Sequence, residues 1–399
     1  MKKTIPSDRE ALWEAHDEEF REPSEIVAYW QDATRIDRRL LEYKVNGRWW
    51  RILEESGITL LVTREYEHLL LALCVDEASR PSVTMMRMPH PSGLTVDRSR
   101  GVVHVASTRN PNQIFDLVPS RGVMQRLDVR GEPFLDSVLL PMRTRFLPGC
   151  LYVHELAMIG DELYANSVGQ NAIVRLSPSG NHTRVWWPKC IETREGPVFG
   201  RNHLQLNSIA AGDTLEESFF SASTDEVSDV RPGDPVFPVD RRGVIFSASS
   251  REPVVRGLTR PHSARNYAQR IWVDNSGYGE VGYVDAGRFQ PVNRLPGWTR
   301  GLSFFGRIMF VGTSRVLPRF SAYAPGLDAR EAQCGIHALD VMSGEILGSI
   351  VWPYGSQIFS VEWVPSTFSS GLPFRLDDDT SGESIRDLFY SFNVSEVQE

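Results

Sequence analysis

The chain has 399 residues, of which 41% are apolar and 24% are charged. These fractions are sufficient for a folded core and exclude wholesale disorder. The formal net charge of −8 argues against a broad nucleic-acid-binding face, and no apolar run of about 18 residues predicts a transmembrane helix. The 31 glycines and 25 prolines are spread along the chain, a pattern typical of many short elements joined by turns.

The first 55 residues differ in pattern from the rest. Apolar residues between positions 12 and 41 recur at roughly helical spacing, with an interruption at Pro23, which predicts two helices. The pair Asn46-Gly47 that follows is typical of a tight turn. We expect residues 1–55 to form a helical extension that packs on a main domain at 56–370, with a polar tail at 371–399.

The start of the chain and the cysteines indicate a compartment. The sequence MKKTIPSDRE is charged where a secretory signal is apolar. Cys74, Cys150, Cys190 and Cys334 lie far apart and form no C-x-x-C pair, as expected for reduced thiols rather than for a disulfide framework or a zinc site. The chain is therefore expected to be cytoplasmic, with neither a membrane nor a nucleic acid as partner.

From residue 58 onward the pattern changes to short β-type runs. Residues 58–63 (ITLLVT) and 69–73 (LLLAL) predict a first hairpin. A unit then recurs that consists of a short apolar strand, a turn with Asp or Gly, and a second strand. Its copies begin near residues 93, 155, 208, 265, 301 and 360, and most steps exceed the ~40–50 residues of tidy propeller repeats.

Short strands in repeated units predict an all-β fold, a β-propeller, in which radial repetition leaves only short sheet edges. Six copies favour six blades, while five or seven remain open. A β-sandwich is the competing all-β fold, but it does not explain the repeated content.

Several motifs resemble those of DUF4915, a family of bacterial conserved hypothetical proteins expected to be propellers. They are VHELA at 153–157, RPHSAR at 260–265, NSGYGE at 275–280, LPGWTRGL at 295–302, CGI at 334–336 and QIFSV at 357–361. The chain departs from the family pattern at 203–208 (HLQLNS), where a His-Leu-Asn-Gly segment is stretched, and at Tyr152, which replaces an acidic residue. The resemblance supports the fold and implies no activity.

The first residues of the inner strands are candidates for a site, because they surround the mouth of a propeller's central channel. In the predicted register these positions are Ser92, His154, Asn207, Ala264, Arg300 and a residue near Phe359. His90 and His262 each lie just before an inner strand, and His203 is a weaker candidate. Glu155, Arg265 and Gln357 lie near the ring and are expected, with Ser92 and Asn207, to contact a ligand.

The residue types of this ring suggest two kinds of chemistry. Arg300 suits a carboxylate or a phosphate, which a guanidinium binds bidentately. His154 and His262 suit acid–base catalysis, or they serve as ligands of a divalent ion such as Mn²⁺, Zn²⁺ or Ca²⁺. The alternative is that these residues only hydrogen-bond neighbouring loops and cap strand ends.

Other motifs predict little. Gly277-Tyr278-Gly279 lacks the context of a nucleotide fingerprint, so no nucleotide cofactor is expected. No G-x-S-x-G element supports a hydrolase triad.

We therefore expect a propeller that binds a small polar or anionic molecule, with His154, His262 and Arg300 as catalytic residues of a lyase, isomerase or cyclising enzyme. The alternative is a non-catalytic module whose rim binds another protein, since fold does not decide function.

Overall fold

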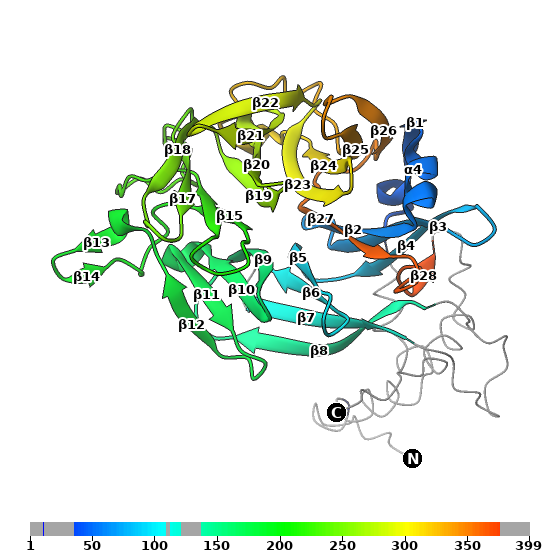
Figure 1. The fold of residues 1–399 in the computed structure, drawn as a ribbon, viewed down its shortest axis with the longest axis horizontal. Coiled ribbons are helices and arrows are strands. Elements are labelled where there is room, and N and C mark those ends of the chain that lie inside the picture. Colours follow the sequence, from blue (N-terminus) through cyan, green and yellow to red (C-terminus); the bar gives the residue numbers. More distant parts are fainter. Residues whose placement is uncertain (1–10, 12–35, 109–111, 121–136, 376–399) are drawn as a thin grey trace, which may run out of the picture.

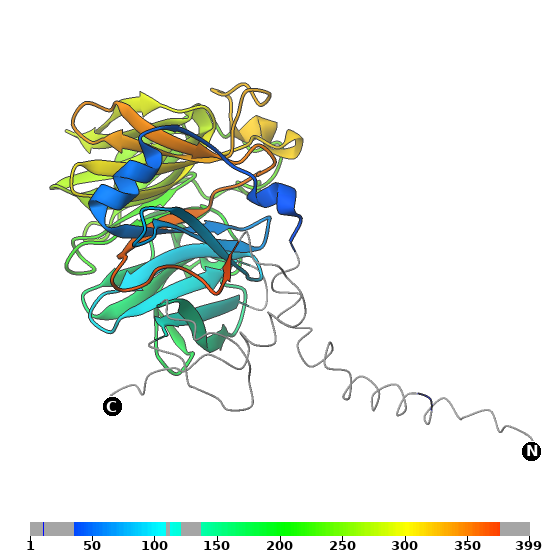
Figure 2. The same ribbon diagram turned by 90° about the vertical axis from the view of Figure 1, so that its right-hand side faces the viewer.

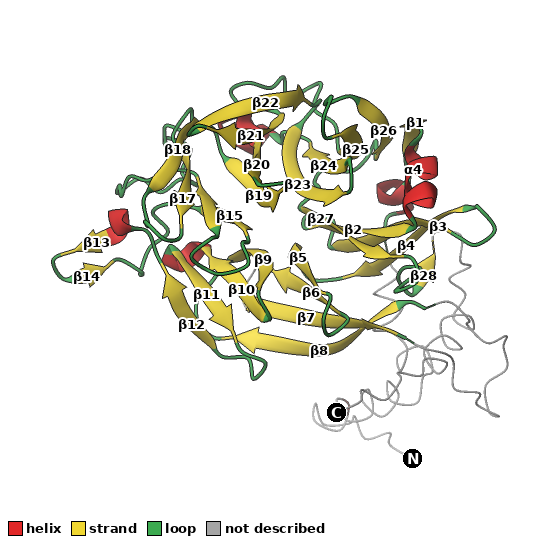
Figure 3. Cartoon of the chain, in the orientation of Figure 1, coloured by secondary structure: helices red, strands yellow, loops and turns green. Residues whose placement is uncertain are grey.

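The computed structural model describes residue 11 and residues 36–108, 112–120 and 137–375. These residues form six antiparallel sheets set radially around one axis, and strands greatly outnumber helices (Figures 1 and 3). The predicted six-bladed propeller is therefore confirmed. The part of the predicted helical extension before residue 36, apart from residue 11, and the tail beyond residue 375 lie outside the described residues.

Each blade has four principal strands, and the first strand of each blade lies next to the axis (Figure 1). From the axis outward, the first three blades in chain order are β5 (Pro91–Asp97), β6 (Val102–Ser107), β7 (Asn112–Pro119) and β8 (Leu139–Leu147); β9 (Val153–Ile159), β10 (Glu162–Ser167), β11 (Ala172–Leu176) and β12 (His182–Trp186); and β15 (Leu206–Ala210), β16 (Phe219–Ala222), β17 (Gly243–Ser247) and β18 (Pro253–Leu258).

The next three blades complete the ring. They are β19 (Pro261–Tyr267), β20 (Arg270–Asn275), β21 (Glu280–Asp285) and β22 (Arg288–Arg294); β23 (Trp298–Phe305), β24 (Ile308–Ser314), β25 (Gly335–Asp340), β26 (Ile346–Val351) and β1 (Lys44–Gly47); and β27 (Ser360–Pro365), β2 (Ile58–Arg64), β3 (Leu69–Val75), β4 (Pro81–Arg87) and β28 (Phe374–Arg375). A small hairpin of β13 (Glu192–Thr193) and β14 (Gly196–Pro197) projects from the ring.

The helices of the described residues are short. They are η1 (Arg38–Leu41), α4 (Trp49–Ser56), η2 (Val168–Gln170), η3 (Lys189–Ile191), η4 (Ser276–Tyr278) and η5 (Pro318–Tyr323). Within the described part of the chain, no helix is long and apolar enough to cross a bilayer.

The two ends of the described chain close the ring together. β27 pairs with β2 over six residues, from Ser360 opposite Thr63 to Pro365 opposite Ile58. The innermost strand of this blade therefore comes from the C-terminal part of the chain, and its next three strands come from the N-terminal part. This is the inner strand that the sequence predicts near residue 360.

An apolar core lies at each junction between neighbouring blades. Because neighbours cover both faces of a blade, the middle strands are apolar almost throughout: six of the seven residues of β3 are buried. Near the axis the inner strands come so close that a Cβ at Gly93 would lie 2.6 Å from the backbone of Glu155. Packing between blades, rather than within one sheet, therefore stabilises the ring.

Part of the predicted N-terminal extension belongs to the ring. β1 pairs with β26 as the fifth strand of its blade, and α4 packs on the outside of the ring, with Trp49 fully buried (Figure 2). The tight turn predicted at Asn46-Gly47 is wrong, since both residues end β1. Gly47, at φ +64°, turns the chain from the strand toward α4, and its strand partner lies far away in sequence.

A charged cluster on the β5 blade links three of its strands. The Asp116 carboxylate accepts hydrogen bonds from Arg145 Nη2 at 2.7 Å and Arg143 Nε at 2.8 Å, and it lies 2.6 Å from His104 Nδ1. Burial alone would raise the pKa of Asp116, but His104 and Arg145 outweigh it and lower the pKa from 3.8 to about 2.

Replacing Asp116 with Asn is expected to destabilise the fold at neutral pH. A carboxyl group with a lowered pKa contributes stability above pH 4 and loses it as the pH falls toward 2. Because Arg143 is half exposed and solvent screens part of the pairing, we expect a loss of about 1–2 kcal/mol. Urea titrations of the wild type and the variant should therefore converge as the pH falls toward 2. The control variant Asp328→Asn changes an exposed carboxylate and should lose little stability. Equal losses of stability in both variants would contradict the proposed role of Asp116.

Candidate functional site

A repeated irregularity marks the start of the inner strands. The register shifts by one residue near the beginning of β5, β9, β15, β19 and β23, as in a β-bulge. Such bulges redirect side chains out of the regular alternation of a strand. The predicted ring positions lie in these bulges: Ser92, His154, Asn207, Ala264 and Arg300.

A cavity of about 480 Å³ lies at this mouth of the channel. Its wall includes five of the predicted site residues, His154, Asn207, His262, Arg300 and Gln357. Residues that the sequence analysis did not select complete the wall: Glu65, Tyr66, Tyr152, Asn202, Gln205, Arg231, Gly233, Arg260, Trp298, Ser314, Arg315, Val316, Leu317, Phe320, Tyr323 and Ser356. Four arginines and one carboxylate line the cavity, so its wall carries an excess of positive charge.

Arg300 is the central cation of this cavity. The residue is only 9% exposed, and its guanidinium lies 3.2 Å from the ring centroid of Phe359. Within the described part of the chain, no oxygen accepts a hydrogen bond from its side chain. Burial lowers the pKa of Arg300 from its ordinary value, but a guanidinium stays charged at neutral pH. Its N–H groups are therefore available to an anion in the cavity.

His262 presents one defined nitrogen to the cavity. Its Nδ1 lies 2.8 Å from the carbonyl oxygen of Arg260 and 3.0 Å from Ser276 Oγ. The Ser276 hydroxyl donates its hydrogen to the Thr299 carbonyl, so both partners of Nδ1 are acceptors. Nδ1 must then carry the hydrogen, and Nε2 is left with a lone pair.

The charge state of His262 follows from its surroundings. Burial, together with the positive charge of Arg300 and the neighbouring His154, lowers its pKa well below 6.5. The imidazole is therefore neutral at pH 7. A neutral imidazole with a free Nε2 can accept a proton or a hydrogen bond from a bound molecule.

Two aromatic side chains flank His154. His154 contacts Tyr152 and Phe359 edge to face, with ring centroids 4.8 and 5.6 Å apart.

Tyr152 has a φ of +54°, and three other non-glycine residues directly before inner strands share this left-handed conformation: His90, Gln205 and Arg260. Such strained residues cost about 1–3 kcal/mol each and often accompany functional sites.

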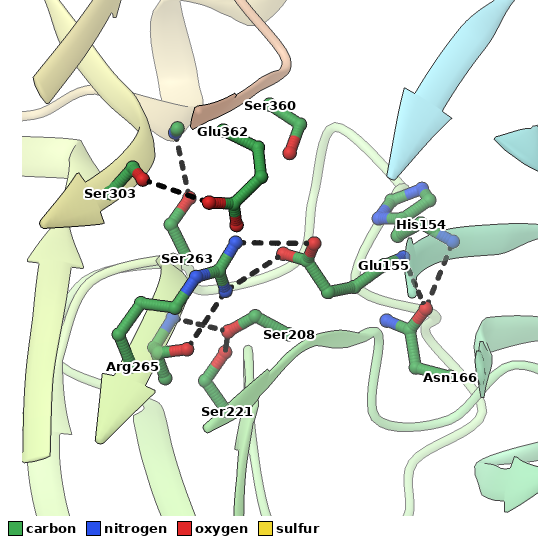
Figure 4. Close-up of polar contacts among 12 residues, drawn as sticks. His154, Glu155, Asn166, Ser208, Ser221, Ser263, Arg265, Ser303, Ser360 and Glu362 are labelled. Carbon is green, nitrogen blue, oxygen red and sulfur yellow. Dashed lines mark hydrogen bonds and ion pairs between the residues drawn. The ribbon is translucent and has the colours of Figure 1, made fainter. Parts of the chain in front are cut away.

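Two further predicted contact residues lie deeper, in the channel itself. Figure 4 shows the guanidinium of Arg265 and the carboxylate of Glu155 pointing toward each other, with both N–O distances 3.3 Å. Burial alone would lower the pKa of Arg265, but Glu155 and Glu362 outweigh it and raise the pKa. Neither Glu155 nor Arg265 is among the residues that line the cavity, and the two side chains pair with each other.

The other predicted positions have structural contacts. The Ser92 hydroxyl lies 3.1 Å from the carbonyl oxygens of both Ala106 and Val153. Ala264 belongs to the core between the β15 and β19 blades. His90 packs against His68, and His203 Nδ1 lies 3.2 Å from the Ser228 carbonyl oxygen. The interpretation as hydrogen-bonding and packing residues fits these positions.

The repeat pattern in the sequence did not predict two parts of the cavity wall, Arg260 and η5. Arg260 lies directly before β19, two residues from His262, and its Nη1 donates to Ser223 Oγ at 3.2 Å. Its burial lowers the pKa to about 10. η5 comes from an insertion between β24 and β25, and it stands out on one face of the ring (Figure 2). Arg260 lies within the RPHSAR motif, whereas η5 has no repeated counterpart.

The side chains at the mouth do not fit the divalent ion considered from the sequence. Among the described residues, no group of three or more His, Cys, Asp or Glu side chains is arranged to hold a metal ion. His154 and His262 would supply two imidazoles, but the guanidinium of Arg300 beside His262 repels a cation. The residues present favour an anion over a metal ion.

The fold and this cavity define a six-bladed β-propeller with a basic cavity at one mouth of its channel. A family model described as "Domain of unknown function (DUF4915)" matches residues 47–371. The chain therefore belongs to the DUF4915 family, as its motifs predict.

Comparisons with known proteins add no activity. No curated protein sequence matches the chain significantly. Similar solved structures include a nidogen/laminin complex (9% identity, TM-score 0.49, 77% of this chain and 98% of that chain). A putative gluconolactonase is similar at 14% identity and a TM-score of 0.42, over 68% of this chain and 80% of that chain. A putative 6-phosphogluconolactonase from Bacteroides uniformis is similar at 13% identity and a TM-score of 0.39, over 72% of this chain and 80% of that chain.

Proposed function

We propose that this protein binds a small anionic molecule in the cavity at the channel mouth, with Arg300 as the anchor of its carboxylate or phosphate group. The observation that carries the proposal is the state of Arg300: a buried guanidinium that faces the cavity without an acceptor from the described residues. A buried cation that lacks a hydrogen-bond acceptor among the described residues is costly, although Glu65 attracts it from the same wall. An anionic ligand offsets this cost when it binds.

The second part of the proposal is acid–base chemistry on the bound molecule. His262 Nε2 is the proton acceptor, because its hydrogen is fixed on Nδ1 and its pKa is lowered well below 6.5. His154, on the neighbouring part of the wall, serves as the second acid–base group. The reaction that we propose for these groups is that of a lyase, an isomerase or a cyclising enzyme, in which proton transfer is the central step.

The test combines a binding survey with one variant. Carboxylates and phosphates should raise the melting temperature of the protein, and acids that bind should then be assayed for turnover. His262→Gln should keep anion affinity within a few fold but lower turnover by about 10²–10⁴-fold, the usual contribution of a general base. If the wild type turns over a bound acid and His262→Gln does so equally well, the catalytic role is excluded.

The protonation of His262 gives a test that needs no ligand. We expect its imidazole to stay in the neutral, Nδ1-protonated form throughout the range around pH 6.5 in which a free histidine titrates. Acid should protonate Nε2 only well below that range, so proton acceptance fails at low pH and holds above it. Nitrogen-15 NMR, with the signal assigned by its absence in His262→Gln, measures this directly. A titration midpoint near 6.5 would contradict the proposed environment.

A further inference from the structure

Two neighbouring inner strands each contribute a residue with a hydrogen-bond acceptor to the wall of the cavity. Asn207, on β15, is 2% exposed, and its Nδ2 donates to the Pro261 carbonyl at 2.9 Å and to Ser223 Oγ at 3.2 Å. These two bonds use both amide hydrogens and fix which way the amide points. Within the described residues, no donor reaches Asn207 Oδ1.

The second acceptor belongs to the adjacent blade. His262 follows Pro261 in β19, and its Nε2 has a lone pair because Nδ1 carries the hydrogen. Both Asn207 and His262 line the cavity, and Arg300 is close enough to lower the pKa of His262. An anionic group on Arg300 therefore lies near His262 and shares the cavity with Asn207.

The surrounding charge decides which donor fits. Arg260, whose Nη1 shares Ser223 Oγ with Asn207, adds a second positive charge to that of Arg300. An ammonium group would be repelled there, whereas a hydroxyl donates without a charge. A plain carboxylic acid would leave Asn207 Oδ1 buried without a donor, which is unfavourable.

We propose that the ligand is a hydroxy acid, whose anionic group binds Arg300 and whose neighbouring hydroxyl donates to Asn207 Oδ1 or His262 Nε2. This inference rests on the proposed anion site and names the class of molecule that the site takes. It also places an ionisable hydroxyl at the nitrogen that is proposed to accept a proton.

The experiment compares matched acids that differ in one group. Isothermal titration calorimetry of the full chain would use lactate against propionate, malate against succinate, and aspartate as the amino analogue. For a matched pair that binds, we expect the hydroxy acid to bind on the order of tenfold more tightly than its deoxy partner, and aspartate more weakly than succinate.

A variant assigns this preference to the acceptor. Asn207→Leu should bring the ratio of malate affinity to succinate affinity close to one, whatever its effect on the affinity for succinate itself. Asn266→Leu makes the same change at the far, exposed end of β19 and should keep the preference. If Asn207→Leu does not fold, the comparison of matched acids in the wild type still shows whether the cavity prefers a hydroxy acid.

The outcomes separate this inference from the proposed function. Equal affinity for both members of each pair, with both lost in Arg300→Gln, overturns the hydroxyl inference and leaves the anion site standing. Binding of no acid of the series, or binding that is unchanged in Arg300→Gln, overturns both. A preference that survives in Asn207→Leu and is lost in His262→Gln supports the hydroxy acid class and assigns the hydroxyl to Nε2.

Discussion

Arg300→Gln is expected to lower the affinity of the cavity for carboxylate and phosphate probes by roughly 100-fold, or about 3 kcal/mol, the scale of a charge-assisted pair of hydrogen bonds. Glutamine keeps a polar side chain at the site but removes the charge and the pair of N–H donors that binds an anion bidentately. Calorimetric titration with succinate and with inorganic phosphate measures the loss.

The same substitution should not destabilise the protein without ligand. The Arg300 guanidinium is buried without a hydrogen-bond acceptor from the described residues. Its removal ends a desolvation cost, and it loses the contact with Phe359 and the attraction to Glu65. We expect the free energy of unfolding to stay constant or to rise, as at sites where stability is sacrificed for function. If the Arg300 guanidinium served only the structure, the substitution would lower the free energy of unfolding.

Arg307→Gln provides the matched control. Arg307 lies in the turn between β23 and β24, on the same hairpin as Arg300, and it pairs with Asp340 while remaining largely exposed. The net charge changes by the same amount, but the cavity is untouched. A loss of anion affinity in Arg307→Gln as large as that in Arg300→Gln would mean that overall charge, and not the site, attracts the probes.

The largest effect on stability is expected at Glu67. Its Oε1 accepts hydrogen bonds from Arg64 Nη2 at 3.0 Å, from the Ser356 backbone N–H at 2.5 Å and from the Gln357 backbone N–H at 3.2 Å. Arg64 in turn donates to the Leu40 carbonyl at 2.7 Å. One carboxylate therefore joins the β2–β3 turn, the N-terminal segment and the loop that carries the cavity residue Gln357.

Glu67→Ala should cost about 3–5 kcal/mol, because it leaves the fully buried Arg64 without its counter-ion. Burial alone would raise the pKa of Glu67, but Arg64 and Ser356 outweigh it and lower the pKa. The contribution is thus present at neutral pH and lost as acid protonates the carboxylate. Chemical denaturation at neutral pH measures the difference.

The exposed pair of Arg51 and Glu55 on α4 serves as the comparison, since both side chains are more than half exposed. Glu55→Ala should cost about 0.5 kcal/mol or less. If the two alanine variants lose similar amounts, the buried carboxylate does not hold the closure of the ring as described.

The architecture could be predicted because each blade begins with the same pattern. Each of the six predicted copies begins within the inner strand of one blade, although β19 (PHSARNY) is not itself an apolar run. The register was also correct at the mouth: His154, Asn207 and Arg300 lie in the bulges that direct side chains toward the cavity.

The rest depends on contacts that no local pattern encodes. Glu155 and Arg265 were expected to contact a ligand, but their side chains face each other and form an ion pair. β1 was hidden because its partner β26 is about 300 residues away, and an isolated Asn-Gly pair does not reveal such a strand. η5 belongs to one insertion and therefore has no repeat to predict it.

A crystal structure of the protein soaked with succinate or phosphate tests the central claim most directly. We expect oxygen atoms of the anion at about 3 Å from the guanidinium nitrogens of Arg300, with His262 Nε2 facing the bound molecule. An anion bound elsewhere, with the Arg300 side chain turned to pair with Glu65, would contradict it.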